Sequence, residues 1–112
     1  MFIAMGGILS SCSSTSQGNQ LAATSCKLVV KGLNYFDKSQ QLTNLSERQD
    51  LNNQATGNLE AAQPIAAQAA QINGKWQALM TTLQEVDRVP ITNLKIALDV
   101  QCSNALGHKI NY

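Results

Sequence analysis

The sequence carries little charge, and the charge it carries is balanced. Charged residues make up 13% of the 112 residues, and the formal net charge is +1. A nucleic-acid-binding protein needs a basic face that neutralises phosphates, and an acidic disordered tail needs a run of carboxylates, so this composition excludes both classes. The length is sufficient for one small domain and too short for two.

Histidine is nearly absent, since His108 in the C-terminal tail is the only one. Nucleophilic catalysis needs a base that a third group orients, and a structural zinc site needs four ligands, so neither is expected. Two carboxylate pairs, Glu47 with Asp50 and Glu85 with Asp87, each lie beside an arginine, which is typical of a solvated helix face rather than of acid–base catalysis. We therefore expect no enzymatic activity, no cofactor and no metal.

Aromatic residues and long apolar runs are also scarce. The longest apolar run, residues 2–9, is far shorter than the roughly 20 residues that a transmembrane helix needs. In their place the chain carries amide and hydroxyl side chains (12 Gln, 10 Asn, 9 Ser and 7 Thr), together with 13 Ala. The aromatic residues are Phe2, Tyr35, Phe36, Trp76 and Tyr112.

The apolar N-terminal segment is the first feature that indicates where the protein acts. Residues 2–9 carry no charge and lead into a run rich in Ser and Thr, which is typical of a secretory signal peptide that ends at small residues. At the junction, Leu9-Ser10-Ser11-Cys12 resembles the lipobox of bacterial lipoproteins. The resemblance implies that the chain is cut before Cys12 and that Cys12 carries a thioether-linked diacylglycerol. The alternative interpretation is a short apolar segment that packs in the core.

This resemblance divides the chain into four expected segments. They are a signal peptide (1–11), a lipid-anchored polar tether (12–25), a helical domain (26–106) and a flexible tail (107–112). A flexible linker as long as this tether has an end-to-end distance of about 20 Å, which would hold the domain just off a membrane. No Lys or Arg precedes the apolar run, so either the signal is a weak one or, as we expect, it begins upstream of Met1.

The three cysteines, at positions 12, 26 and 102, are an odd number, which leaves one thiol unpaired in an exported protein. If Cys12 takes lipid, Cys26 and Cys102 remain as an even pair near the two ends of the folded region. An oxidising compartment would join them, and the loop-entropy model gives about 4 kcal/mol for a loop of this length. The alternative is two buried free thiols. We expect the Cys26–Cys102 disulfide.

The clearest helical pattern covers residues 58–88, where apolar residues recur at steps of three or four. Thr56-Gly57-Asn58 predicts its start and Val89-Pro90 its end, because the residue before a proline avoids the α region. Pro64 and Gly74 are weak points inside the pattern. The apolar stripe is rich in Ala, which suits either an intramolecular core, as we expect, or a dimer seam.

Similar spacing predicts helices over about 22–36 and 40–54, and Asn44 with Glu47 has capping-box spacing, so the second helix can begin later. Residues 94–102 alternate as in a strand, which would pair with 27–31, but they also fit a helix over 91–105, which we favour. The expected fold is an all-α bundle of three to four helices (about 22–36, 40–54, 58–88 and 91–105) cross-linked by one disulfide.

A distance constraint shapes this expected bundle. If residues 22–54 were one straight helix and 57–88 returned beside it, Cys26 and Cys102 would lie roughly 16 Å apart. A disulfide needs Cα atoms within about 7 Å. We therefore expect a break near Gly32–Ser39 that folds the first helix back.

The only tryptophan, Trp76, is expected to anchor the core with Tyr35 and Phe36 packed against it; the alternative is that all three form a partner surface. These features favour a small non-enzymatic lipoprotein of the bacterial envelope, anchored to the outer membrane or cell surface, facing the periplasm or the exterior and binding an unidentified protein. Inhibitors, immunity factors and exclusion factors belong to this class. The alternative is a secreted or surface structural protein that self-associates through its Ala- and Gln-rich helix. Neither nucleic acid nor metal is an expected partner.

Overall fold

A computed structural model of the chain describes the backbone of residues 2–110 and the side chains of residues 16–110. Within that range every regular element is helical, and a disulfide joins Cys26 to Cys102, so the predicted all-α bundle with one cross-link is confirmed. The elements are α1 (Phe2–Gln40), α2 (Leu45–Ile72), the short 3-10 helix η1 (Gly74–Trp76), α3 (Gln77–Gln84) and α4 (Ile91–Leu106).

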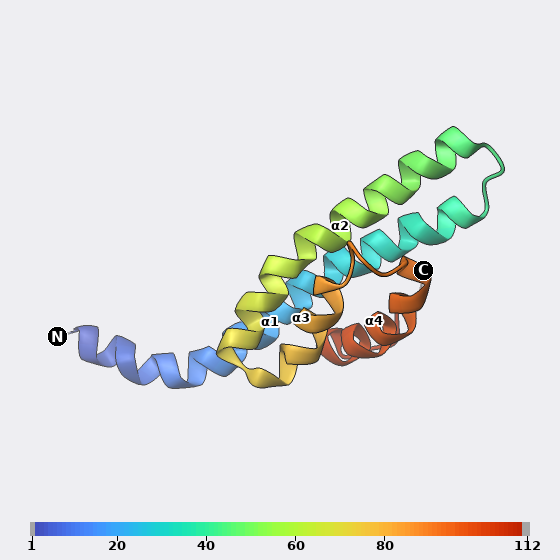
Figure 1. Cartoon of the computed structure of the whole chain (residues 1–112). Helices are drawn as coiled ribbons and strands as arrows, with labels where there is room; N and C mark the ends of the chain where they lie inside the picture. Colours follow the sequence, from blue (N-terminus) through green and yellow to red (C-terminus); the bar gives the residue numbers. More distant parts are fainter. Residues whose placement is uncertain (1, 111–112) are drawn as a thin grey trace.

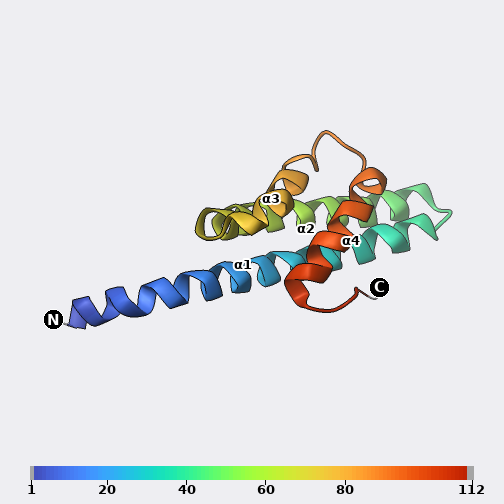
Figure 2. The ribbon, with the colours of Figure 1, turned by 90° about the horizontal axis from the view of Figure 1, so that it is seen from below.

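Helices α1 and α2 form a long antiparallel hairpin, and the two shorter helices cover one side of it. Figure 1 shows α3 and α4 packed against the middle of this hairpin, while its closed end projects beyond them. That projecting end, residues 38–51, is named the arm. At the other end, the first part of α1 extends past the end of α2 (Figure 2). The result is an elongated molecule of 62 × 23 × 20 Å.

Small residues line the interface between α1 and α2. On α1 they include Gly18, Ala22, Ser25 and Gly32, at helical steps of three, four and seven, and each is buried. The facing side of α2 carries fully buried residues at steps of three or four: Ala55, Leu59, Ala62, Ala66 and Ala69. The two backbones approach so closely that a Cβ at position 32 would lie 3.0 Å from the Ala55 carbonyl oxygen. The predicted Ala-rich stripe is therefore an intramolecular core.

The predicted break near Gly32–Ser39 is wrong, because α1 runs through it without interruption. Gly32 lies within the helix, at the point where the backbone of α2 comes closest to it, and not in a turn. Ser39 is fully buried, and its hydroxyl donates to the Phe36 carbonyl oxygen at 2.6 Å and contacts Asn52 Oδ1 at 2.9 Å. Both residues therefore fasten the hairpin where their low helix propensity predicted an end.

The predicted boundaries of the second and third helices are also wrong. Residues 45–72 form one helix, α2, that continues through Gly57 and Pro64. Pro64 lies on the exposed side, where water can hydrate the Glu60 carbonyl that loses its helical donor. The start is better predicted, since Asn44 caps α2 by accepting from the Glu47 amide at 3.1 Å.

The real break falls at Asn73–Gly74, inside the segment predicted as one helix over 58–88. The Asn73 side chain accepts from the Lys75 amide at 3.1 Å, which begins η1 and turns the chain. Because α2 ends at Ile72, α3 reverses direction early and α4 reverses it again. Cys102 thereby reaches the level of Cys26 although α1 is unbroken. The predicted break assumed one long return helix over residues 57–88, and that assumption is wrong.

Helix α4 confirms the choice of helix over strand, and its observed end differs by one residue from the prediction. Gly107 ends it in the left-handed conformation at φ 77°, and its amide donates to the Ser103 carbonyl at 2.9 Å. Beyond it Ile110 is half-buried against the core, so this part of the predicted flexible tail is packed. The predicted tether, residues 12–25, is helical and includes the buried Ala22.

Candidate functional site

The disulfide is the covalent connection between α1 and α4. The Cα atoms of Cys26 and Cys102 lie 5.3 Å apart, and both side chains are fully buried. Leu98, one turn before Cys102, is also fully buried, whereas Lys95 approaches the Asp37 carboxylate at 3.9 Å near the surface. The cross-link therefore lies in the core and stabilises the contact between the two helices.

The predicted lipidation site, Cys12, belongs to α1 by its backbone, but its side chain lies outside the described residues. Cys26 and Cys102 are joined to each other, so Cys12 is the remaining cysteine of the chain.

Trp76 is a core residue, as the first interpretation predicts. Its side chain is 4% exposed, and its Nε1 donates to Asn19 Oδ1 at 3.2 Å. The Lys75 ammonium lies over the indole ring, 4.8 Å from its centroid. Trp76 therefore fastens the turn between α2 and α3 to α1, and its burial leaves little surface for a partner.

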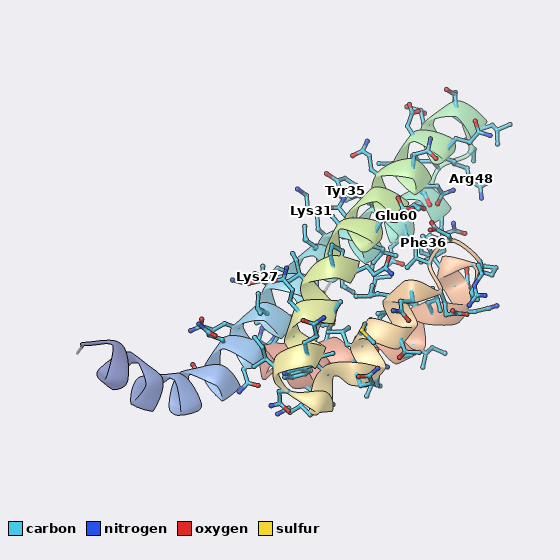
Figure 3. All side chains as sticks on the ribbon, turned by 60° about the vertical axis from the view of Figure 1, so that its left-hand side comes forward. Lys27, Lys31, Tyr35, Phe36, Arg48 and Glu60 are labelled. Atoms are coloured by element: carbon cyan, nitrogen blue, oxygen red, sulfur yellow. A yellow bond between two sulfur atoms is a disulfide. The ribbon has the colours of Figure 1, made fainter. Side chains whose placement is uncertain are left out.

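Tyr35 and Phe36 do not pack against Trp76, which corrects that expectation. They follow Asn19, the partner of Trp76, by four turns of α1, or about 24 Å. The helix also separates them from each other: Figure 3 shows Tyr35 on one side of the hairpin and Phe36 on the other, near Glu60. Any partner surface therefore involves one or the other rather than both.

Phe36 lines a cleft at the base of the arm. This cleft has a volume of about 390 Å³ and lies between the hairpin and the connection from α3 to α4. Asn52 and Thr56 contribute polar groups from α2, and the connection contributes apolar ones around Pro90. The lining is Phe36, Asn52, Thr56 and residues 86–92. The cleft therefore combines polar groups with an aromatic wall.

Two carboxyl groups face each other beside this cleft. Asp87 hydrogen-bonds the Glu60 side chain, and this bond together with the repulsion between the two charges raises the pKa of Glu60 above 4.5. Both side chains are exposed, so solvent screens the repulsion. The sequence had paired Asp87 with Glu85 instead, because the contact with Glu60 exists only after folding.

Tyr35 belongs to a second surface, a row of lysines on the outward side of α1. Figure 3 shows Lys27, Lys31 and Tyr35 along that side, and Lys38 continues the row. The lysines are exposed and Tyr35 is half-buried. Sequence reasoning missed this row, although the steps of four and seven between the lysines place them on one helix face.

His108, the only histidine in the sequence, lies beyond the end of α4. His108 is exposed, and its Nδ1 lies 3.0 Å from the neighbouring Lys109 carbonyl oxygen. Among the residues that the structure describes, no three His, Cys, Asp or Glu side chains are grouped so that they could hold a metal ion. No helix in that part of the chain is both long enough and apolar enough to cross a bilayer.

Comparison with known protein families, with characterised proteins and with solved structures finds no match for this chain.

Proposed function

We propose that this chain is a small non-enzymatic lipoprotein of the bacterial envelope, lipid-anchored at Cys12, that binds another protein through the cleft lined by Phe36. The protein is exported, and its helical domain faces the periplasm or the exterior. It acts as an accessory, inhibitory or immunity-type module whose effect comes from occupying its partner.

One observation carries the proposal of export and lipidation. The Cys26–Cys102 disulfide is buried in the core, and such cross-links form and persist in oxidising compartments outside the cytoplasm. With these two cysteines paired, Cys12 is the one left over, and it follows the lipobox-like residues Leu9-Ser10-Ser11. An exported protein thereby avoids a free thiol.

The position of the cleft supports protein binding rather than self-association. Its aromatic wall, Phe36, is half-buried and therefore remains partly accessible. The alternative function needs the Ala-rich stripe for association between chains. That stripe includes Ala62, Ala66 and Ala69, which are fully buried against α1 and leave no such surface.

Lipidation is tested by metabolic labelling with radioactive palmitate in a bacterial host, followed by mass spectrometry of the membrane-extracted protein. We expect a mature chain that begins at Cys12 and carries acyl groups. Ser13→Ala is the matched control and should be labelled normally, whereas Cys12→Ser should be unlabelled and retain residues 1–11. A membrane-extracted chain that begins at Met1 with an unmodified Cys12 would refute the proposal.

Partner binding is tested with a photoreactive residue at Thr92, which lines the cleft, and at Gln68, which is exposed on the outer side of α2. In the bacterium that produces the protein, we expect a discrete adduct from position 92 and none from position 68. Phe36→Ala, which removes the aromatic wall, should reduce the adduct. Equal adducts from both positions would contradict a partner site at the cleft.

A further inference from the structure

The lysine row on α1 places three exposed ammonium-bearing side chains, Lys27, Lys31 and Lys38, on one face of the helix. At 100° per residue, Lys27, Lys31 and Lys38 fall within about 40° of one another around the helix axis. Uncharged polar residues continue the same face toward the N-terminus, among them Gln20 and Thr24. A chain with a net charge of only +1 therefore presents a local excess of positive charge on one side.

The carboxylates of the molecule do not neutralise this row. The only acidic residue of α1, Asp37, lies about 100° from the middle of the row, on the side where Lys95 approaches it at 3.9 Å. Within the described residues, none of the three lysines has a carboxylate within 4.0 Å. Their ammonium groups are exposed and remain available to an external anion.

From this charge distribution we infer that the outward face of α1, formed by Lys27, Lys31, Tyr35 and Lys38, docks on a membrane surface rich in anionic phospholipid headgroups. The inference rests on the proposed anchoring at Cys12. Cys12 precedes Lys27 by fifteen residues of the same helix, about 22 Å, so the row of an anchored chain reaches the headgroups when α1 lies along the membrane surface. Tyr35 adds an amphipathic ring of the kind that favours the membrane interface.

In this orientation the lysine row and the cleft lined by Phe36, on opposite sides of the hairpin, contact different things. The lysine row contacts headgroups, while Phe36 and its cleft lie on the other side of the hairpin and face away from the membrane (Figure 3). The lipid holds the protein at the membrane, and the lysines set which side is presented to a partner.

The test uses the full-length chain with Cys12→Ser, which cannot take lipid, and vesicles of phosphatidylcholine with or without about 30% phosphatidylglycerol. Each lysine near an anionic surface contributes about 1 kcal/mol, or roughly a fivefold factor in the partition coefficient. We expect anionic vesicles to bind the protein in a salt-sensitive manner. The triple variant Lys27→Gln, Lys31→Gln, Lys38→Gln should bind roughly 100-fold less tightly.

A matched control removes the same net charge elsewhere: Lys75→Gln, Arg88→Gln, Lys109→Gln, all at exposed positions. It should retain binding within a fewfold, and circular dichroism should show that both triple variants are folded. Equal losses in the two variants, or no preference for anionic vesicles, would overturn the inference, and an acidic protein would become the better occupant. Because the tested chain carries no lipid, either result is independent of the labelling experiment at Cys12.

Discussion

Helix α1 is held by two neighbours in two different ways. Against α2 it makes a long contact of small residues, close enough at Gly32 that no Cβ fits without displacing the Ala55 carbonyl. Against α4 the contact is short, with Leu98 and Cys102 as the fully buried side chains of that helix. The first interface is stabilised by many weak contacts over several turns, and the second by one covalent bond supported by a few side chains.

The difference shows how a chain with few large apolar residues forms a stable core. Alanine buries little area per residue, so α1 and α2 gain stability only by approaching closely over a long distance. Helix α4, at 16 residues, has no such length against α1 and crosses it locally. The disulfide compensates for this short contact, because it lowers the conformational entropy of the unfolded chain and so favours the folded state.

Removing the disulfide should have the largest effect on stability and should weaken the α4 side selectively. The double variant Cys26→Ala, Cys102→Ala opens a loop closed over a sequence separation of 76 residues, which the loop-entropy model equates with about 4 kcal/mol. Denaturant titration followed by circular dichroism measures the free energy of unfolding. A loss below about 1 kcal/mol would mean that non-covalent contacts already hold α4.

The close approach of α1 and α2 predicts opposite effects for two glycine substitutions. Gly32→Val places branched carbon atoms against Ala55 and Leu59 and should cost about 1–3 kcal/mol through overpacking. Gly57→Ala, at an open position in the middle of α2, should instead stabilise the protein by about 0.5–1 kcal/mol. Thermal unfolding of both variants checks the signs. If Gly32→Val were neutral, the two backbones would not be as close as described.

A smaller effect is expected at the contact between α1 and the turn after α2. Asn19→Ala removes the acceptor for Trp76 Nε1, which water can replace in part because Asn19 is exposed, so about 0.5–1 kcal/mol should be lost. Trp76 is the only tryptophan, so its fluorescence reports this site alone. We expect emission at longer wavelength in the variant. Unchanged emission and stability would show that the hydrogen bond contributes nothing to this contact.

The smallest effect concerns Glu60 and Asp87, which link α2 to the connection before α4. Because the folded protein raises the pKa of Glu60 above its ordinary 4.5, the folded state binds more protons than the unfolded state just above that pH. The repulsion is absent below pH 4.5 and develops as the pH rises through the raised pKa, so stability falls over that interval. Asp87→Asn should flatten this part of the stability profile. Superimposable pH profiles of the two proteins would contradict the interaction.

Much of the fold was predictable because it depends on spacing. The steps of three and four assign helices, and the number of cysteines leads to the Cys26–Cys102 pair once Cys12 is set aside. The helix boundaries were less predictable, since Gly32 and Gly57 look alike in the sequence. One is required by a neighbouring backbone and the other is exposed, and only tertiary contacts distinguish them.

The candidate site was less accessible to sequence reasoning. Trp76 was identified as a core residue, but its partner Asn19 is 57 positions away and exposed, and nothing in the sequence marks it. Tyr35 and Phe36 are adjacent in the chain and therefore lie about 100° apart on a helix, which already argued against a shared surface. The lysine row was visible as a spacing of four and seven, but its significance depends on where the carboxylates lie after folding.

Amide hydrogen exchange of the Cys26→Ala, Cys102→Ala variant, compared with the oxidised protein, tests the central claim most directly. If α2 holds α1 by close packing and the disulfide holds α4, the amides of α4 should lose most of their protection. The amides of α1 and α2 along the buried stripe, from Ala22 to Gly32 and from Ala55 to Ala69, should remain protected. Simultaneous loss of protection in all three helices, or full protection of α4, would contradict the account.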